Sequence, residues 1–295
     1  MALIGNPNTG KSTLFNCLTG LRQKVGNYSG VTVQKKTGIT SIGGENIEIL
    51  DLPGTYSLAA ESPDERVVVE ALRGEIENVD RPEMALCILD ATNLKRNLFL
   101  AYQIGQLGLP MVLALNYWDS AKKRRIDIDL AELRSRLGVP VVPISASRAE
   151  GIAELKEAIA ETLVSQPRLR TPDWPDSVIE ALDEMRAVLP SESLEKLDEA
   201  ALLRSFFEGD KERLLRSGAS ETQVAEALNS GKKVLFKGGL NPANVEAVLL
   251  YRHIKTIIDS SIKHDALSQT RGSESIDSLL THKWWGLIAF MGLMY

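Results

Sequence analysis

A glycine-rich loop near the start of the chain has the residue types of a phosphate-binding site. Residues 5–12 read Gly-Asn-Pro-Asn-Thr-Gly-Lys-Ser and fit the pattern G-x-x-x-x-G-K-[ST]. The glycines let backbone N–H groups approach phosphate oxygens, Lys11 places a cation on the β- and γ-phosphates, and the Ser12 hydroxyl ligates Mg²⁺. The predicted phosphate-binding residues are Gly5, Asn8, Thr9, Gly10, Lys11, Ser12 and Thr13.

A second short pattern indicates which base the nucleotide carries. Asn116 and Asp119, spaced as Asn-x-x-Asp, follow the apolar run 111–115. The Asp119 carboxylate can accept from N1–H and the exocyclic amine of guanine, which adenine does not offer in that arrangement. Ser145, Ala146 and Ser147 end another apolar run, where a backbone N–H can meet the guanine carbonyl. These residues predict GTP and GDP as ligands; an ATPase is the alternative if Asn116 and Asp119 stand there by accident.

A third pattern, Asp51-Leu52-Pro53-Gly54, also follows an apolar run. Asp51 can hold the Mg²⁺ shell through water, and the Gly54 N–H can sense the γ-phosphate. An ordinary turn is the alternative interpretation, because Asp and Gly are common turn residues. Thr55 and Tyr56 come next, and neither orients a hydrolytic water well, so we expect slow intrinsic hydrolysis.

The elements that position these motifs alternate along residues 1–165. Strands are expected at Ala2–Ile4, Val31–Ile42, Asn46–Leu52, Met84–Asp90, Met111–Asn116 and Val141–Ser145. Helices are expected at Lys11–Thr19, Asp64–Leu72, Leu94–Leu107, Leu130–Leu137 and Ile152–Leu163. This alternation predicts an α/β fold, a P-loop domain with a mostly parallel sheet and helices on both faces. The motifs follow strand ends, where open α/β sheets bind ligands.

The rest of the chain has a different pattern. Three prolines in residues 166–175 predict a boundary after a nucleotide-binding domain at 1–165. A small all-α domain is expected at 172–265 and a polar linker at 266–283. Residues 284–295 are uncharged and apolar, and we interpret them as the start of a transmembrane helix in a truncated sequence; a segment packed on the domain is the alternative.

The net charge of the chain limits the kind of partner that it can bind. The net charge is -5, with 18 basic and 20 acidic residues in 1–165, and 16 and 19 in 166–295. Neither half is basic, which argues against a nucleic-acid binder. A soluble GTPase of ribosome assembly, the alternative function, would need a basic second domain.

The motifs above resemble the G domains of small GTPases and, more closely, the FeoB ferrous-iron transporters. The resemblance also rests on residues 25–33 and 90–98 and extends to 277–284; Tyr117 departs from it, since related GTPases often have Lys there. It implies a cytoplasmic G domain, a helical spacer domain that tunes nucleotide release, and a part in the bacterial inner membrane that carries Fe²⁺. We also expect homo-oligomers formed through that membrane part.

The resemblance implies further site residues. Thr32 would be the switch threonine that joins Mg²⁺ when GTP is bound. Asn8 matches a position that binds K⁺, with backbone carbonyls near Asn27 completing the site. The predicted catalytic residues are therefore Lys11, Thr32, Gly54 and Asn8, with K⁺ supplying the charge that an arginine finger supplies elsewhere.

Overall fold

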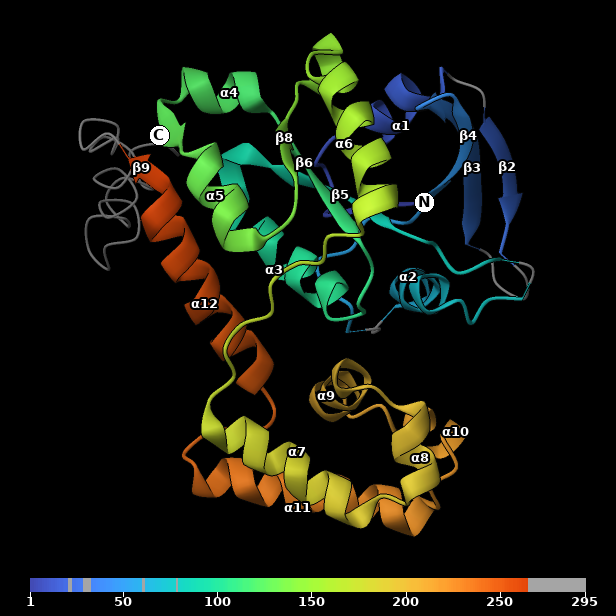
Figure 1. Cartoon of the computed structure of the whole chain (residues 1–295), viewed down its shortest axis with the longest axis vertical. Helices are drawn as coiled ribbons and strands as arrows, with labels where there is room; N and C mark the ends of the chain where they lie inside the picture. Colours follow the sequence, from blue (N-terminus) through green and yellow to red (C-terminus); the bar gives the residue numbers. More distant parts are fainter. Residues whose placement is uncertain (21–22, 29–32, 60–61, 78, 265–295) are drawn as a thin grey trace, which may run out of the picture.

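The computed structural model describes residues 1–20, 23–28, 33–59, 62–77 and 79–264, in an α/β part (1–165) and a helical part (176–261) (Figure 1). Its main strands are β1 (Ala2–Gly5), β2 (Gln23–Asn27), β3 (Gln34–Ile42), β4 (Glu45–Asp51), β5 (Ala85–Asp90), β6 (Met111–Asn116) and β8 (Val141–Pro143). The helices of the α/β part are α1 (Lys11–Thr19), α2 (Pro63–Arg73), α3 (Leu94–Gly105), α4 (Trp118–Lys123), α5 (Leu130–Leu137) and α6 (Ile152–Ser165).

The seven strands form one sheet in the order β2-β3-β4-β1-β5-β6-β8. β1 pairs in parallel with β4 and β5, and β6 pairs in parallel with β5 and β8. Only the pairs β2–β3 and β3–β4 of this sheet are antiparallel. Because the other four pairs are parallel, the predicted mostly parallel α/β sheet is confirmed. The strand expected at Val31–Ile42 begins at Gln34, after Val33, and Val31 and Thr32 lie outside the described residues. β2 was not predicted, because all five of its residues are exposed and the strand has no apolar alternation.

Alternate residues of the central strands face opposite sides of the sheet. On β1, Ala2 and Ile4 pack into one core with α2, α3 and α5, whereas Leu3 packs into a second core with α1 and α6. The motif loops follow the carboxyl ends of β1, β4, β6 and β8. Because these strands run parallel, their carboxyl ends lie at the same edge of the sheet. The sheet thus brings motifs that are far apart in sequence to one edge.

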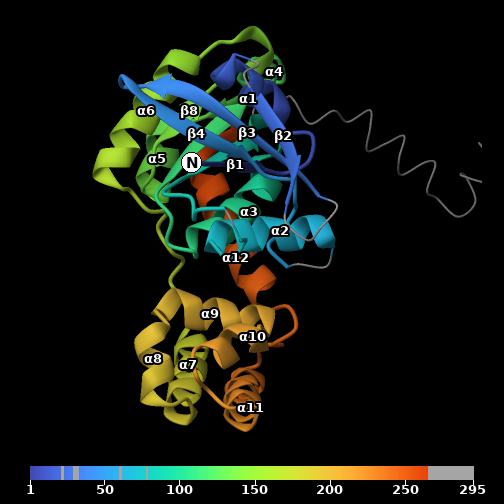
Figure 2. The same ribbon diagram turned by 90° about the vertical axis from the view of Figure 1, so that its right-hand side faces the viewer.

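The helical part has its own core. Its helices are α7 (Asp176–Val188), α8 (Ser191–Lys196), α9 (Glu199–Glu208), α10 (Lys211–Arg216), α11 (Glu221–Lys237) and α12 (Val245–Ser261). α7 and α11 lie side by side and bury Met185, Ala227 and Leu228 among apolar neighbours. Figure 2 shows the helical part on one side of the α/β part, with α12 connecting the two.

α12 packs against both parts of the chain. Val245 and Leu249 lie in the helical core, whereas Leu250, Ile254 and Ile257 join the core beneath α3. Beyond it, β9 (Ile262–His264) pairs antiparallel with β7 (Ile126–Ile128), a second small sheet. The domain bounds 1–165 and 172–265 stay predictions.

The predicted linker 266–283 and the predicted start of a membrane helix at 284–295 lie outside the described residues. Among the residues that are described, no helix combines the length and the apolar character needed to cross a membrane.

Candidate functional site

The glycine-rich loop turns tightly between β1 and α1. Gly10 has φ 87°, and a Cβ atom there would lie 2.3 Å from Asn116 Nδ2, so only glycine fits. No side chain caps the start of α1, and its first turn has no acidic residue. The N–H groups at this helix end are therefore available to an anion, together with the positive end of the helix dipole.

Asn116 holds two of the motif loops together. Its Nδ2 donates to the Thr9 carbonyl oxygen at 2.8 Å, and its Oδ1 accepts from the Ala146 N–H at 2.9 Å. The side chain is buried and satisfied by these two loops. Asn116 thus positions the phosphate loop relative to the 145–147 loop, a role that its place in the sequence alone does not reveal.

Asp119 lies in the first turn of α4, beside the same loops. The Ser145 hydroxyl lies 3.3 Å from Asp119 Oδ1, and Arg148 Nη2 lies 3.4 Å from Oδ2. Tyr117, the departure from the family pattern, donates its hydroxyl to the Asn8 carbonyl oxygen at 3.0 Å. Ser147 is exposed in the short 3₁₀ turn Ala146–Arg148. The predicted base-reading residues therefore come together next to the phosphate loop.

Lys11 and Asp51 form a salt bridge across the phosphate loop. Asp51 is buried at the end of β4, while Ser12 is exposed at the start of α1. Burial, with a smaller contribution from the Asp51 charge, raises the pKa of Tyr28, which is itself buried. A hydroxyl and a carboxylate are ligands that Mg²⁺ accepts, and Mg²⁺ usually binds few protein ligands besides phosphate oxygens and water. In the described part of the chain, no group of three or more His, Cys, Asp or Glu could hold a metal.

The loop after Asp51 packs directly on the phosphate loop. A Cβ atom on Gly54 would lie 3.3 Å from Pro7, and the Thr55 N–H donates to the Gly5 carbonyl oxygen at 3.3 Å. Thr55 is buried, and its hydroxyl donates to the Ser57 carbonyl oxygen at 2.7 Å. The hydroxyl also lies 3.2 Å from Glu65 Oε1 of α2, and the expectation of slow hydrolysis stays a prediction.

The predicted metal contacts of two residues, Thr32 and Asn8, remain untested. Thr32 lies outside the described residues. Asn8 has φ 64° and an exposed side chain, and Asn27 ends β2 on the sheet edge. The described contacts do not link Asn8 to Asn27, so the K⁺ site stays a prediction.

A chain of hydrogen bonds leads from the Gly54 loop into the helical part. The Leu58 N–H donates to Gln103 Oε1 on α3 at 2.8 Å, and Gln103 Nε2 donates to Glu246 at 3.2 Å. Glu246, in the first turn of α12, accepts from Arg204 Nη1 of α9 at 3.0 Å. No sequence motif marks these residues, and their one visible signal is that Arg204 lies in the otherwise mostly apolar stretch 200–207.

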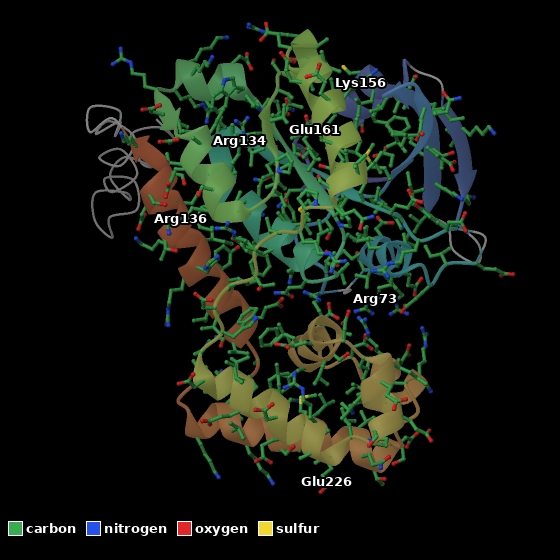
Figure 3. All side chains as sticks on the ribbon, in the orientation of Figure 1. Arg73, Arg134, Arg136, Lys156, Glu161 and Glu226 are labelled. Atoms are coloured by element: carbon green, nitrogen blue, oxygen red, sulfur yellow. The ribbon has the colours of Figure 1, made fainter. Side chains whose placement is uncertain are left out.

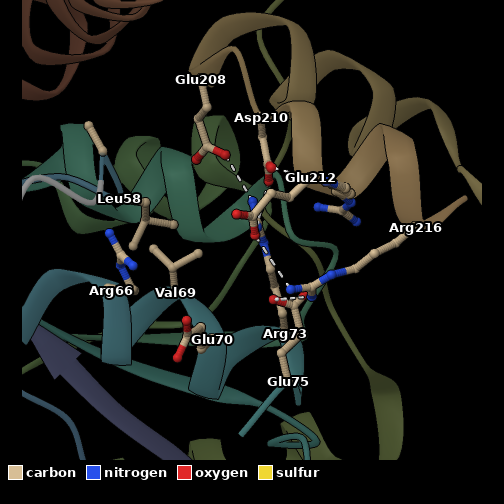
Figure 4. Close-up of a pocket in the computed structure, with 12 residues that line it drawn as sticks. Leu58, Arg66, Val69, Glu70, Arg73, Glu75, Glu208, Asp210, Glu212 and Arg216 are labelled. Atoms are coloured by element: carbon tan, nitrogen blue, oxygen red, sulfur yellow. Dashed lines mark hydrogen bonds and ion pairs between the residues drawn. The ribbon is translucent and has the colours of Figure 1, made fainter. Parts of the chain in front are cut away.

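The same series of hydrogen bonds and ion pairs continues from Arg204 back to α2. Arg204 pairs with Glu208, which also accepts from Arg73 Nη2 at 2.8 Å, while Arg73 Nη1 donates to Asp210 at 2.9 Å. Arg73, Glu208 and Asp210 border a cavity of about 460 Å³ between the two parts (Figure 4), and Figure 3 places Arg73 on the face that meets the helical part. Burial lowers the pKa of Arg204 to about 10, so it remains charged at pH 7. The segment from Leu58 to Arg73 is thus held at both ends.

Comparisons with known proteins agree with this geometry. A family model described as Ferrous iron transport protein B matches residues 1–159. The Fe(2+) transporter FeoB of Escherichia coli K12 is 34% identical over 300 residues, covering all of this chain and 37% of the relative. The chain therefore spans little more than a third of the curated relatives it matches.

Solved structures match both parts. The cytosolic domain of L. pneumophila FeoB has a TM-score of 0.69 and 31% identity, covering 89% of this chain and 99% of that one. An S. thermophilus NFeoB mutant bound to GDP reaches a TM-score of 0.76 at 29% identity, with 89% and 98% covered. The T. maritima cytosolic domain in its GMPPNP form reaches 0.73 at 29% identity, again with 89% and 98% covered.

Proposed function

Because this chain belongs to the ferrous iron transport protein B (FeoB) family, we propose that it is the GTP-binding and GTP-hydrolysing module of a ferrous-iron transporter. The proposal rests on the two hydrogen bonds by which the Asn116 side chain joins the loops of Thr9 and Ala146, with Asp119 beside them. This arrangement sets a guanine-reading carboxylate at a fixed position relative to a phosphate loop. The family match favours this function over a soluble GTPase of ribosome assembly.

In this proposal Lys11 and the start of α1 bind the β- and γ-phosphates. Ser12, Asp51 and Thr32 would hold Mg²⁺, which neutralises charge on the transferring phosphoryl group. Since Lys11 pairs with Asp51, arrival of the phosphates gives this lysine a competing anion and leaves the carboxylate for the Mg²⁺ shell. Loss of the γ-phosphate would release Thr32 and Gly54 and relax the segments that follow them.

Competition between GTP and ATP tests the proposal directly. We expect the chain, with Mg²⁺, to bind GTP at least about a hundredfold more tightly than ATP, because adenine does not offer the Asp119 carboxylate the two donors of guanine. Turnover to GDP and phosphate should be slow, on the order of 10⁻³ per second. Fluorescent-nucleotide displacement and phosphate release measure the two quantities. Tighter binding of ATP would overturn the guanine assignment.

We further propose that K⁺ at Asn8 speeds hydrolysis, since Thr55 and Tyr56 supply no water-orienting group. GTP turnover in KCl should exceed turnover in NaCl about tenfold or more, because a bound cation stabilises the developing phosphate charge. Asn8→Ala should remove the difference, whereas Asn229→Ala, an exposed asparagine of α11, should keep it. Equal rates of the parent chain in the two salts would contradict the K⁺ site.

The helical part, in our proposal, tunes nucleotide release. Its support is the hydrogen-bonded route from Leu58 through Gln103, Glu246 and Arg204 to Arg73. A change in the loop that contains Gly54 would alter contacts at both ends of α2. The helical part would then favour either the GTP-bound or the GDP-bound conformation of that loop. The membrane part, its homo-oligomers and the placement of this region on the cytoplasmic side of a bacterial inner membrane belong to the same proposal.

A further inference from the structure

Four consecutive basic residues lie on an exposed corner of the α/β part. Lys122 and Lys123 end α4, and Arg124 and Arg125 form the turn that follows. All four are exposed, and none forms an ion pair with a residue that the structure describes. Lys122 Nζ lies 5.6 Å from the centre of the Trp118 ring. Such a cluster is informative in a chain whose net charge is -5.

The small sheet β7–β9 places this basic corner beside His264, the last residue that the structure describes. β7 begins directly after Arg125, and its residues Ile126 and Asp127 pair with His264 and Lys263 of β9. The pairing joins residues more than a hundred positions apart, and Figure 1 shows α4 and the end of β9 at the same corner of the molecule. Exposed Lys263 adds a fifth cation.

The acidic groups on the neighbouring elements leave this charge largely uncompensated. Asp119 of α4 pairs with Arg148, and Asp129 accepts from two N–H groups at the start of α5. Asp127 is the exposed acidic residue of β7, set opposite Lys263. The corner therefore carries a net positive charge directed to solvent.

We propose that the basic corner, residues 122–125 with Lys263, binds anionic phospholipid headgroups. The inference rests on the proposed membrane attachment. From His264 the sequence continues through 19 residues to the uncharged apolar run 284–295. A linker of that length spans at most about 65 Å when extended. An apolar run inserted in a bilayer would thus keep the basic corner close to the leaflet, where its effective concentration is high and each cation is attracted to anionic lipid.

Vesicle sedimentation of the full chain tests this inference. We expect vesicles with about one third phosphatidylglycerol to bind the chain about tenfold or more tightly than pure phosphatidylcholine vesicles. The triple change Lys122→Gln, Lys123→Gln and Arg124→Gln should abolish that preference. Arg125 is left in place because its backbone has φ 55°. Added salt should weaken the preference, since it screens exposed charges.

A matched control separates position from net charge. Lys232, Lys233 and Lys237 are exposed cations of α11 without ion pairs among the described residues, and their change to Gln should keep the preference. Equal loss in both triple variants, or an unchanged preference in the first, would overturn the proposal. So would an RNA oligonucleotide that binds more tightly than the anionic vesicles and displaces them.

The outcomes keep this inference apart from the proposed function. Binding to neutral vesicles reports the apolar run, and GTP binding by each triple variant reports an intact nucleotide site. A chain that binds GTP and neutral vesicles but gains nothing from phosphatidylglycerol would overturn the basic-corner inference alone. A chain that prefers anionic vesicles but ignores GTP would contradict the proposed function alone.

Discussion

Asp119→Asn is expected to weaken GTP binding at least about a hundredfold and to favour xanthosine triphosphate instead. The carboxylate can accept from both N1–H and the exocyclic amine of guanine, whereas an amide offers one acceptor and turns a donor toward the other group. The guanine amine then faces a donor, which leaves polar groups of the site unpaired. Xanthine has a carbonyl at that position, and it can accept from the new amide.

Competitive displacement of a fluorescent GTP analogue measures both affinities. Asp127→Asn is the matched control, because Asp127 is an exposed aspartate on β7, close in sequence to the site but outside it. We expect this control to bind GTP as the parent chain does. An Asp119→Asn chain that keeps its preference for GTP over xanthosine triphosphate would show that Asp119 does not read the base.

Arg204→Met is expected to destabilise the chain by about 3–5 kcal/mol, since at this interface it leaves Glu246 without a cation among the described residues and Glu208 with Arg73 alone. The Arg204 side chain is fully buried, and its partners Glu208 and Glu246 are mostly buried. Its Nη1 also donates to Gln106, directly after α3, at 2.9 Å, so the change reaches both parts of the chain. Methionine fills a similar length without a charge.

Thermal unfolding followed by circular dichroism should show the midpoint falling by about 10 °C. Arg136→Met is the control, because Arg136 forms an exposed i,i+4 pair with Glu132 on α5, and such pairs contribute little. Adding Glu246→Gln to Arg204→Met should restore part of the loss by removing one unpaired charge. A midpoint shift no larger than that of Arg136→Met would contradict the role of Arg204.

The same variant tests whether the route through Arg204 affects the nucleotide. If the helical part tunes release, GDP should dissociate from Arg204→Met at a rate different from the parent chain, at a temperature where both are folded. An unchanged rate beside a lowered midpoint would assign Arg204 to stability alone. The hydrogen-bonded route would then be a structural contact and not a regulatory one.

Sequence patterns predicted those elements whose structure depends on neighbouring residues in the sequence. The runs at 84–90 and 111–116 are apolar because both faces of their strands are buried, so β5 and β6 were placed within a residue at either end. The phosphate loop could also be recognised from the sequence, since Gly10 and Lys11 belong to one continuous segment. The parallel arrangement followed from alternation, and it implied that the motif loops meet at one edge.

Long-range pairings of short or polar segments had no such signal. β2 is wholly exposed, and β7 and β9 have three residues each, too few to show a period. The segment of α12 contains many apolar residues, but their spacing does not say which surface covers them. Only the fold shows that this helix packs on α3 and α5 and ends beside the basic corner.

The sequence by itself therefore determined the α/β fold, the nucleotide loops and the family, because these depend on residue types at fixed local spacing. The tertiary structure decided how the loops are held, through Asn116, and how the two parts are joined, through Arg204. Each of these side chains bonds to a partner about a hundred residues away in the sequence, Asn116 to Thr9 and Arg204 to Gln106. Such contacts exist only once the chain has folded, because hydrogen bonds between buried groups require their backbones to be positioned first.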